Sequence, residues 1–231
     1  SSGSLDFNMA NTNTGKLNAT GGNLNVNGGT LTLVNGSSVK DTVATTINGN
    51  VDVQAGADLN LNSGDSWSSA GKVTLNGGTL NYSDLTSNGV IDAKTGDLNI
   101  NSGTLNVGNN SSIESAVNTT VTGDMNISGS GKVVLDGSDK WTGDITMSGG
   151  SLDYSLDSNG KLVASGGNLT VRGGTLTLAT DSSVGNAVKT AIKSDVVVNG
   201  GELNLNSGDS WTSGTITMDD GTFNYSDITS S

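Results

Sequence analysis

The sequence predicts an all-β protein, specifically a right-handed parallel β-helix (β-solenoid) with about three short strands per coil. Three observations lead to this fold class. Glycine fills 35 of the 231 positions, and only 3 Trp, 3 Tyr and 2 Phe occur, so a compact aromatic core is not expected. Apolar and polar residues alternate in very short segments, and the whole pattern then recurs with a much longer period.

The short segments read as strands that glycine turns separate. Residues 24–26 (Leu-Asn-Val) are followed by 27–29 (Asn-Gly-Gly) and then by 31–33 (Leu-Thr-Leu). Antiparallel hairpins are the alternative, because Asn-Gly is a common hairpin turn, but hairpins with strands this short bury almost nothing. A coil of three strands with glycine corners instead buries each inward Leu or Val beneath the next coil.

The size of a coil follows from this spacing. Three strands and their corners need roughly 20 to 24 residues, which predicts about ten coils. With about 4.8 Å between neighbouring strands, the predicted rod is about 50 Å long.

The long period shows in three kinds of marker residue. Trp67, Trp141 and Trp211 are 74 and 70 residues apart, the tyrosines 72 and 71, and a leucine series 74 and 71. We therefore predict a single solenoid, 1–231, built of three long repeats at about 16–89, 90–160 and 161–231, each of about three coils.

One part of each repeat interrupts the regular alternation of apolar and polar residues. We expect residues 35–48, 108–120 and 180–194 to bulge from one corner, with Val43, Val117 and Val188 folded back as anchors.

Composition narrows the possible partners. The net charge of −12, with 10 basic residues and no histidine, argues against nucleic-acid binding and against anionic membranes. The chain has no cysteine, no apolar run long enough to span a membrane and no export signal, so we expect a piece of a larger secreted protein that does not itself insert into a membrane.

The Asp-Ser-Trp motifs at 65–67 and 209–211, with Asp-Lys-Trp at 139–141, are the first candidate site. An exposed indole would offer a platform for a sugar ring. Trp67, however, lies where the register expects an inward residue, so we interpret these tryptophans as structural, and Tyr82, Tyr154 and Tyr225 likewise.

The outward polar positions are the candidate binding face. We expect them to form rows of short hydrogen-bonding groups that bind another copy or a glycan by many weak contacts, or that are simply solvated. The rows comprise Asn25, Asn99 and Thr170; Thr32, Asn106 and Thr177; Thr74, Thr146 and Thr217; and Asn81, Asp153 and Asn224.

Other chemistry is less well supported by the sequence. The acidic pairs Asp219-Asp220 and Asp136 with Asp139 could bind calcium, but no calcium-binding repeat or loop motif occurs, so we predict no metal and no cofactor. Some β-solenoids cleave polysaccharides, so a polysaccharide-cleaving enzyme is the alternative function. No pair of catalytic carboxylates and no nucleophile motif stands out in the sequence. Ice binding ranks lower, because the rows mix Asn, Asp and Thr.

The repeated Gly-Gly-x-Leu-x-Val and Asn-Gly-Gly-Thr-Leu stretches resemble the passenger domains of Gram-negative autotransporters, especially the self-associating adhesins. This resemblance implies anchoring at the outer membrane by a part not included here, and a location on the bacterial cell surface. It also implies self-association, biofilm formation or attachment to host surfaces. A passive stalk of a giant surface protein is the main alternative.

Overall fold

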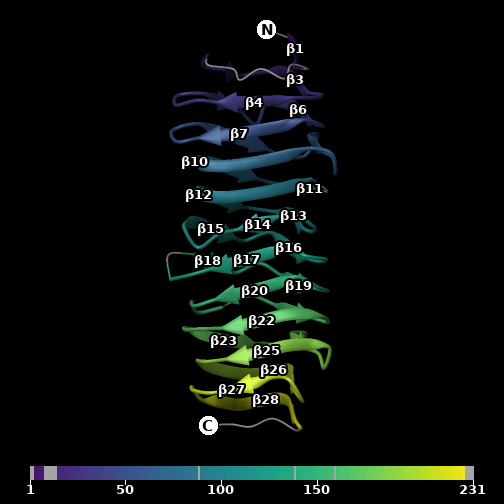
Figure 1. Ribbon diagram of the computed structural model, residues 1–231, viewed down its shortest axis with the longest axis vertical. Helices are drawn as coiled ribbons and strands as arrows, with labels where there is room; N and C mark the ends of the chain where they lie inside the picture. The colour runs from purple at the N-terminus through teal and green to yellow at the C-terminus, as the bar shows by residue number, and fades with distance from the viewer. Residues whose placement is uncertain (1–2, 8–14, 88, 138, 159, 227–231) are drawn as a thin grey trace. The chain divides into compact units, whose positions relative to one another are not determined.

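The computed structural model describes residues 3–7, 15–87, 89–137, 139–158 and 160–226, and it confirms the predicted fold class. These residues contain strands and no helix, and parallel strands stack in about 11 turns of a β-solenoid (Figure 1). The chain forms two compact units. Unit 1 comprises residues 1–106 and 110–123, and unit 2 comprises 107–109 and 124–231.

In unit 1 the strands lie on three faces, called sheets 1a, 1b and 1c here, and from residue 22 on the chain visits them in that order. On face 1a the strand pairs run from Ser4–Phe7 to Ser66–Trp67 and begin again at Leu85–Ser87. Sheet 1a contains β1 (Ser4–Phe7), β3 (Gly22–Val26), β6 (Val43–Ile47), β9 (Ser66–Trp67), β11 (Leu85–Ser87) and β13 (Gly103–Val107). Sheet 1b contains β4 (Thr30–Leu33), β7 (Asn50–Gln54), the first halves of β10 (Lys72–Tyr82) and β12 (Val90–Ile100), and β14 (Ser112–Ile113). Sheet 1c contains β2 (Asn18–Ala19), β5 (Ser38–Val39), β8 (Asp58–Leu61), the second halves of β10 and β12, and β15 (Val117–Val121).

Unit 2 is built in the same way from sheets 2a, 2b and 2c. Sheet 2a contains β16 (Asp124–Ile127), β19 (Ile145–Met147), β21 (Leu162–Ala164), β24 (Ser183–Val184) and the second halves of β26 (Asp195–Leu205) and β28 (Ile216–Tyr225). Sheet 2b contains β17 (Lys132–Leu135), β20 (Ser151–Tyr154), β22 (Gly167–Val171), β25 (Val188–Ile192) and β27 (Ser210–Trp211). Sheet 2c contains β18 (Lys140–Trp141), β23 (Thr175–Leu178) and the first halves of β26 and β28.

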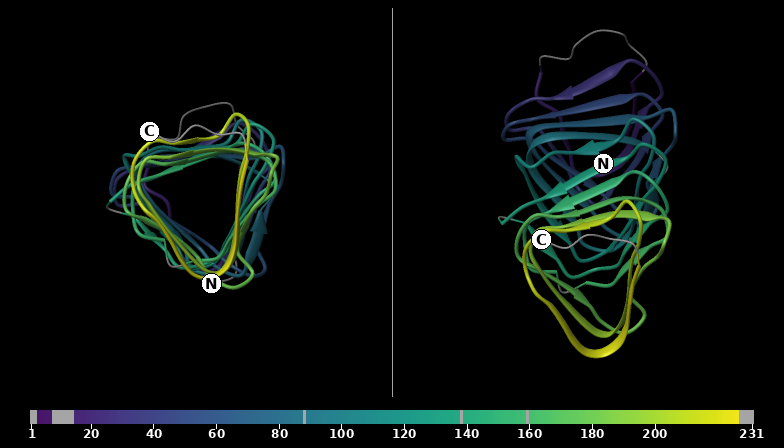
Figure 2. Two further views of the ribbon diagram at one scale, coloured as in Figure 1. Left: turned by 90° about the horizontal axis from the view of Figure 1, so that it is seen from below. Right: turned by 60° about the horizontal axis from the view of Figure 1, so that its bottom comes forward.

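The coils of each unit trace a triangle when seen from one end (Figure 2). Inward and outward residues alternate as the sequence predicts: in β3, Leu24 and Val26 are buried whereas Asn25 between them is half-buried. The strand pairs of the described residues are parallel, so inward side chains stack on those of the neighbouring coils.

Glycine allows the sharp corners between sheets. Gly96 has a φ of 107°, and a Cβ there would lie 2.3 Å from the carbonyl oxygen of Gly78 in the preceding coil. A larger residue would therefore meet both backbone strain and a steric clash.

The coils are slightly shorter than predicted, and this changes the meaning of the long repeat. Hydrogen bonds between successive coils join residues 16 to 24 positions apart, most of them 18 to 22. In unit 1, eleven steps from sheet to sheet separate Leu24 in sheet 1a from its repeat equivalent Leu98 in sheet 1c, which is three turns and two thirds. In unit 2, Trp141 and its equivalent Trp211 likewise belong to different sheets, 2c and 2b.

The prediction of about three coils per repeat is therefore wrong. One long repeat contains eleven strand segments, whereas one turn contains three, so a repeat is not a whole number of turns. Equivalent residues of two repeats within a unit therefore lie on different faces.

The predicted bulges are also wrong. Residues 35–48, 108–120 and 180–194 supply regular strands of the coil, among them β6, β15 and β25. The anchors are confirmed, because Val43, Val117 and Val188 are 2, 0 and 1% exposed. The alternation is interrupted because polar Thr45, Thr119 and Thr190 take inward positions in these strands, and each is 1% exposed.

Candidate functional site: the outward polar faces

The predicted binding residues lie on several sheets, not on one face. In unit 1 they are Asn25 and Asn106 (sheet 1a), Thr32 and Thr74 (sheet 1b), and Asn81 and Asn99 (sheet 1c). In unit 2 they are Thr146 and Asn224 (sheet 2a), Thr170 (sheet 2b), and Thr177 and Thr217 (sheet 2c).

The rows expected from the sequence are not formed. Asn25 and Asn99 were expected in one row, yet they belong to different sheets of unit 1, because the long repeat is not a whole number of turns. Asn25 instead donates to the carboxylate of Asp6 in β1. The structure brings Asn99 next to Asn81, which the sequence pattern had assigned to another row.

Thr32 was also expected to be an accessible outward residue, but it is only 7% exposed. Asn106 is half-buried, and its amide donates to the backbone oxygen of Ser87 in the preceding coil. Thr32 is therefore not presented to solvent, whereas Asn106 keeps part of its side chain exposed.

Sheet 1c carries an asparagine ladder. The Asn81 amide donates to Asn60 Oδ1 at 2.9 Å, and Asn99 donates to Asn81 Oδ1 at 2.9 Å. The Asn60 amide donates to the backbone oxygen of Val39, which continues the line at 2.6 Å. Within the ladder Asn81 both donates and accepts, Asn60 only accepts and Asn99 only donates. Each amide therefore keeps a second N–H and lone pairs that can serve an outside partner.

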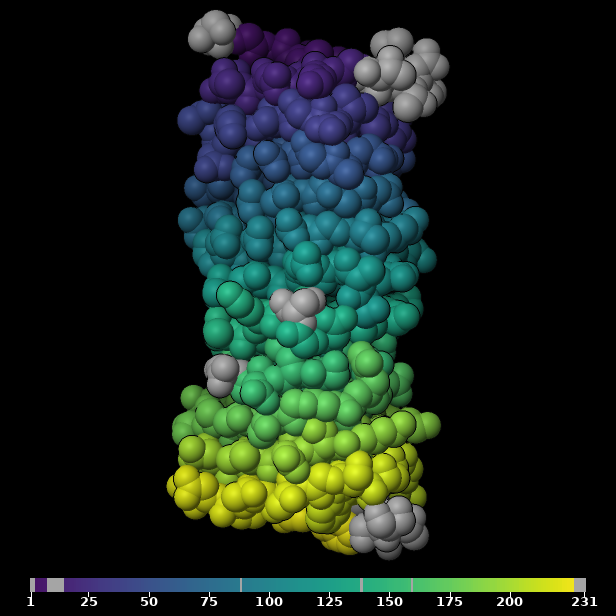
Figure 3. All heavy atoms as spheres, turned by 90° about the vertical axis from the view of Figure 1, so that its left-hand side faces the viewer, coloured from purple at the N-terminus to yellow at the C-terminus, as the bar shows by residue number. Residues whose placement is uncertain are grey.

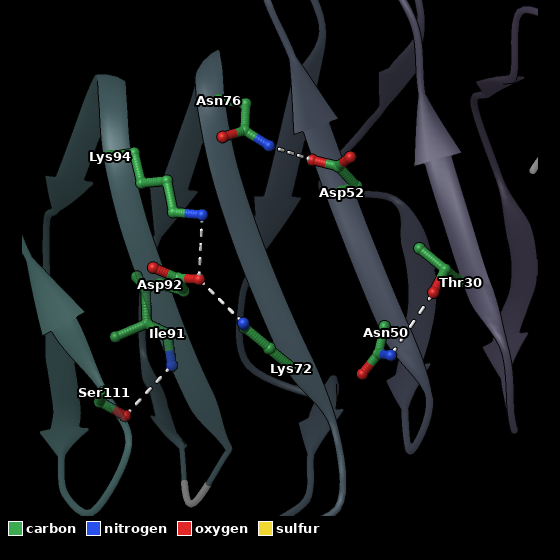
Figure 4. A network of polar contacts seen from close by, with 9 residues as sticks. All are labelled: Thr30, Asn50, Asp52, Lys72, Asn76, Ile91, Asp92, Lys94 and Ser111. Carbon is green, nitrogen blue, oxygen red and sulfur yellow. Dashed lines mark hydrogen bonds and ion pairs between the residues drawn. The ribbon is translucent and has the colours of Figure 1, made fainter.

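Sheet 1b carries a charged network beside this ladder (Figure 4). Asp52 accepts from Asn76 at 2.7 Å and from Gln54 at 2.6 Å. Asp92 meets the Lys72 ammonium at 2.8 Å and the Lys94 ammonium at 3.5 Å.

The lysines decide the protonation of Asp92. Burial alone would raise its pKa, but the hydrogen bond and positive charge of Lys72, together with Lys94, lower the pKa below the ordinary value. Asp92 is therefore ionised at neutral pH and balances one of the two positive charges beside it.

Aspartates of the Asp-Ser-Trp motifs join successive coils. Asp65 Oδ1 accepts the backbone N–H of inward Thr45 at 2.6 Å, and its Oδ2 accepts the N–H of Asn62 at 2.8 Å. In the third repeat Asp209 makes the same contacts, with Thr190 at 2.6 Å and with the N–H of Asn206 at 2.8 Å.

The structural interpretation of these tryptophans is confirmed for Trp67 and Trp141. Trp67 and Trp141 are 3 and 1% exposed, and their indole N–H groups donate to the backbone oxygens of Gly71 and Gly143. Trp211 is half-buried. A sugar-stacking platform needs an open indole face, which Trp67 and Trp141 do not offer.

The tyrosines differ from one another. Tyr82 is fully buried, and its hydroxyl donates to the backbone oxygen of Thr104 at 2.9 Å. Tyr154 is also fully buried and packs edge-on against Trp141 with ring centroids 5.6 Å apart. Tyr225 is 44% exposed, so the structural interpretation holds for the first two only.

The described residues contain no group of three or more His, Cys, Asp or Glu side chains that could hold a metal ion. Between Asp136 and Asp139, one calcium candidate, the Asp136 backbone N–H donates to the Asp139 carboxylate and closes a turn. No helix in the described part of the chain is long and apolar enough to cross a membrane.

Sequence reasoning missed one surface hollow. An open cavity of about 550 Å³ lies in unit 2, lined by residues from three turns that include Lys140, Leu156 and Gly174. Only the tertiary fold brings these segments together.

Comparison with known proteins found no matching family, no matching curated protein and no matching solved structure.

Proposed function

We propose that this chain is a non-enzymatic segment of a cell-surface adhesin that mediates self-association, biofilm formation or attachment through its polar solenoid faces. The observation that supports the proposal is the ladder of Asn60, Asn81 and Asn99 on sheet 1c. Its half-buried amides stand in register on a flat sheet, and each retains hydrogen-bonding capacity. In the space-filling view the outward side chains lie close together, row beside row (Figure 3).

Such a surface suits adhesion by summed weak contacts. A single exposed amide contributes little, because water competes for its hydrogen bonds. A row of identical groups on a rigid sheet binds more strongly than one group, because the first contact brings the neighbouring groups into position for theirs.

A passive stalk is the second candidate, and a specific observation favours it as well. The ladder amides and the Asp52 and Asp92 carboxylates already have partners within the molecule. Polar rows that satisfy one another stabilise the stack of coils without any outside ligand.

The settling rate of a non-aggregating bacterium that displays the chain separates these functions. We expect rapid settling of cells with the wild-type chain, and loss of settling with Asn81→Lys/Asn99→Lys. The matched control is Ser63→Lys/Ala70→Lys, which adds the same charge at exposed turns of unit 1. Circular dichroism of each purified chain checks the fold.

If ladder and control variants settle as fast as wild type, sheet 1c is not the adhesive surface. If wild-type cells do not settle at all, self-association is ruled out, and attachment to another surface or a passive stalk remains.

A further inference from the structure

Four of the six basic residues of unit 2 lie on or beside one sheet, although the whole chain carries a net charge of −12. Lys132, Lys189 and Lys193 are exposed on or beside sheet 2b, and so is Arg172. Among the outward residues of the described strands β17, β20, β22 and β25, Asp153 is the one acid, and it pairs with Arg172. Asp136 directly follows β17, as Arg172 follows β22 and Lys193 follows β25, and is the second acid of this face. Four basic and two acidic residues leave the local charge positive.

The register arranges two of these cations in a line. Lys132 pairs with Ser151, Ser151 with Asn168, and Asn168 with Lys189. The backbone positions of the two lysines thus lie three strands apart, about 14 Å at the usual strand spacing, with Ser151 and Asn168 between them. Lys193 directly follows β25, and its backbone N–H bonds the oxygen of Val171 in the neighbouring strand.

These lysines differ from those of sheet 1b. There, Lys72 and Lys94 share Asp92 as a counter-ion. Within the described part of the chain, Lys132, Lys189 and Lys193 form no ion pair, so their charge is available to an outside partner.

We infer that sheet 2b is a docking face for a linear anionic polysaccharide, one that carries carboxylate or sulfate groups. The charges favour a polyanion. The hydroxyl and amide groups between them match the sugar hydroxyls between anionic substituents.

A polysaccharide fits this face better than a protein or a membrane does. The outward apolar side chains of the four strands are Val134, which is 9% exposed, and Ala191. A protein interface normally has an apolar or aromatic centre, and peripheral membrane binding needs apolar side chains that insert. Flat polar sheets without such anchors favour an extended, hydrated ligand.

The test is a binding titration of the full chain with fluorescently labelled heparin and polygalacturonate, with neutral dextran as the probe without charge. We expect binding to both polyanions and not to dextran, weakening as salt is raised. Lys132→Glu/Lys189→Glu should weaken binding about tenfold or more, because two attractive charges become repulsive. Lys140→Glu/Lys161→Glu is the matched control, with the same charge change outside sheet 2b, and it should bind within about twofold of wild type.

Absence of polyanion binding by the wild-type chain at physiological salt would overturn the inference. Equal losses in both double variants would also overturn it, since general charge and not this face would then be responsible. If the Lys132/Lys189 variant instead loses self-association in sedimentation, or binding to anionic lipid vesicles, while polysaccharides do not bind, the occupant is a second copy or a membrane and the inference is wrong. Self-association through sheet 1c can fail without affecting this result, because the two sheets and their variants are distinct.

Discussion

Removing the Asp65 carboxylate tests whether the Asp-Ser-Trp motif holds successive coils together. In Asp65→Ala the backbone N–H of Thr45, which is 1% exposed, loses its acceptor. A buried donor without a partner costs about 1–3 kcal/mol, and the lost bond from the Asn62 N–H costs about 0.5–1.5 kcal/mol more. We therefore expect the free energy of unfolding to fall by about 2–4 kcal/mol.

The pH dependence of Asp65→Asn provides a second arm. Burial raises the pKa of Asp65 above 3.8, opposed by the hydrogen bonds from Thr45 and Asn62 and reinforced by the nearby charge of Asp41. A carboxyl with a raised pKa binds its proton more tightly in the folded state, so its contribution to stability is greatest below pH 3.8 and declines as pH rises through the folded pKa. The stability deficit of Asp65→Asn relative to wild type should thus be larger near pH 3 than near pH 7.

Urea denaturation followed by tryptophan fluorescence measures both effects. With a slope of about 2–3 kcal/mol per M, the expected loss in Asp65→Ala lowers the midpoint by about 1 M. Asp41→Ala is the control, since it removes an exposed carboxylate from the same corner and should shift stability by no more than about 0.5 kcal/mol. Equal midpoints for Asp65→Ala and Asp41→Ala would refute the role of Asp65 in joining the coils.

Three further perturbations test packing, corners and buried ionisation. Trp141→Ala should cost about 3–5 kcal/mol in denaturant titrations, and Trp211→Ala clearly less, because Trp141 is 1% exposed and Trp211 only half-buried. Gly96→Ala should lower the melting temperature more than Gly64→Ala. Both glycines have a φ above 100°, but a Cβ at position 64 meets open space. Equal losses of melting temperature would contradict the steric clash at position 96. Burial raises the pKa of Tyr82 to about 12, so the contribution of its hydroxyl to stability is lost as pH rises from 10 towards 12. The free energy of unfolding of Tyr82→Phe should therefore decline less over that range than that of the wild type. Identical dependence on pH in the two chains would count against this.

Much of the fold followed from local pattern. Strict alternation, as in Leu24-Asn25-Val26, determines which side chains face the core, and glycine corners determine where the chain bends. The same register correctly buried Trp67, whereas Val43 was expected inside as the anchor of a bulge and is buried in a regular strand. Parallel stacking followed because strands this short bury their apolar side chains only when another coil covers them.

The neighbours of the outward residues could not be predicted from the local pattern. Which outward residues meet depends on the number of residues per turn, and an error of two or three residues accumulates over successive coils. The long repeat therefore suggested that Asn25 and Asn99 share a row, whereas the coils place Asn99 beside Asn81 and Asn25 beside Asp6.

The sequence by itself determined the fold class, the inward residues and the excess of acid. Only the tertiary structure decided how the polar and charged groups combine into surfaces. The basic residues of sheet 2b are scattered between positions 132 and 193 in a strongly acidic chain, so total charge hides them. The register of four parallel strands brings them together, because hydrogen bonding between coils fixes each residue opposite one about twenty positions away.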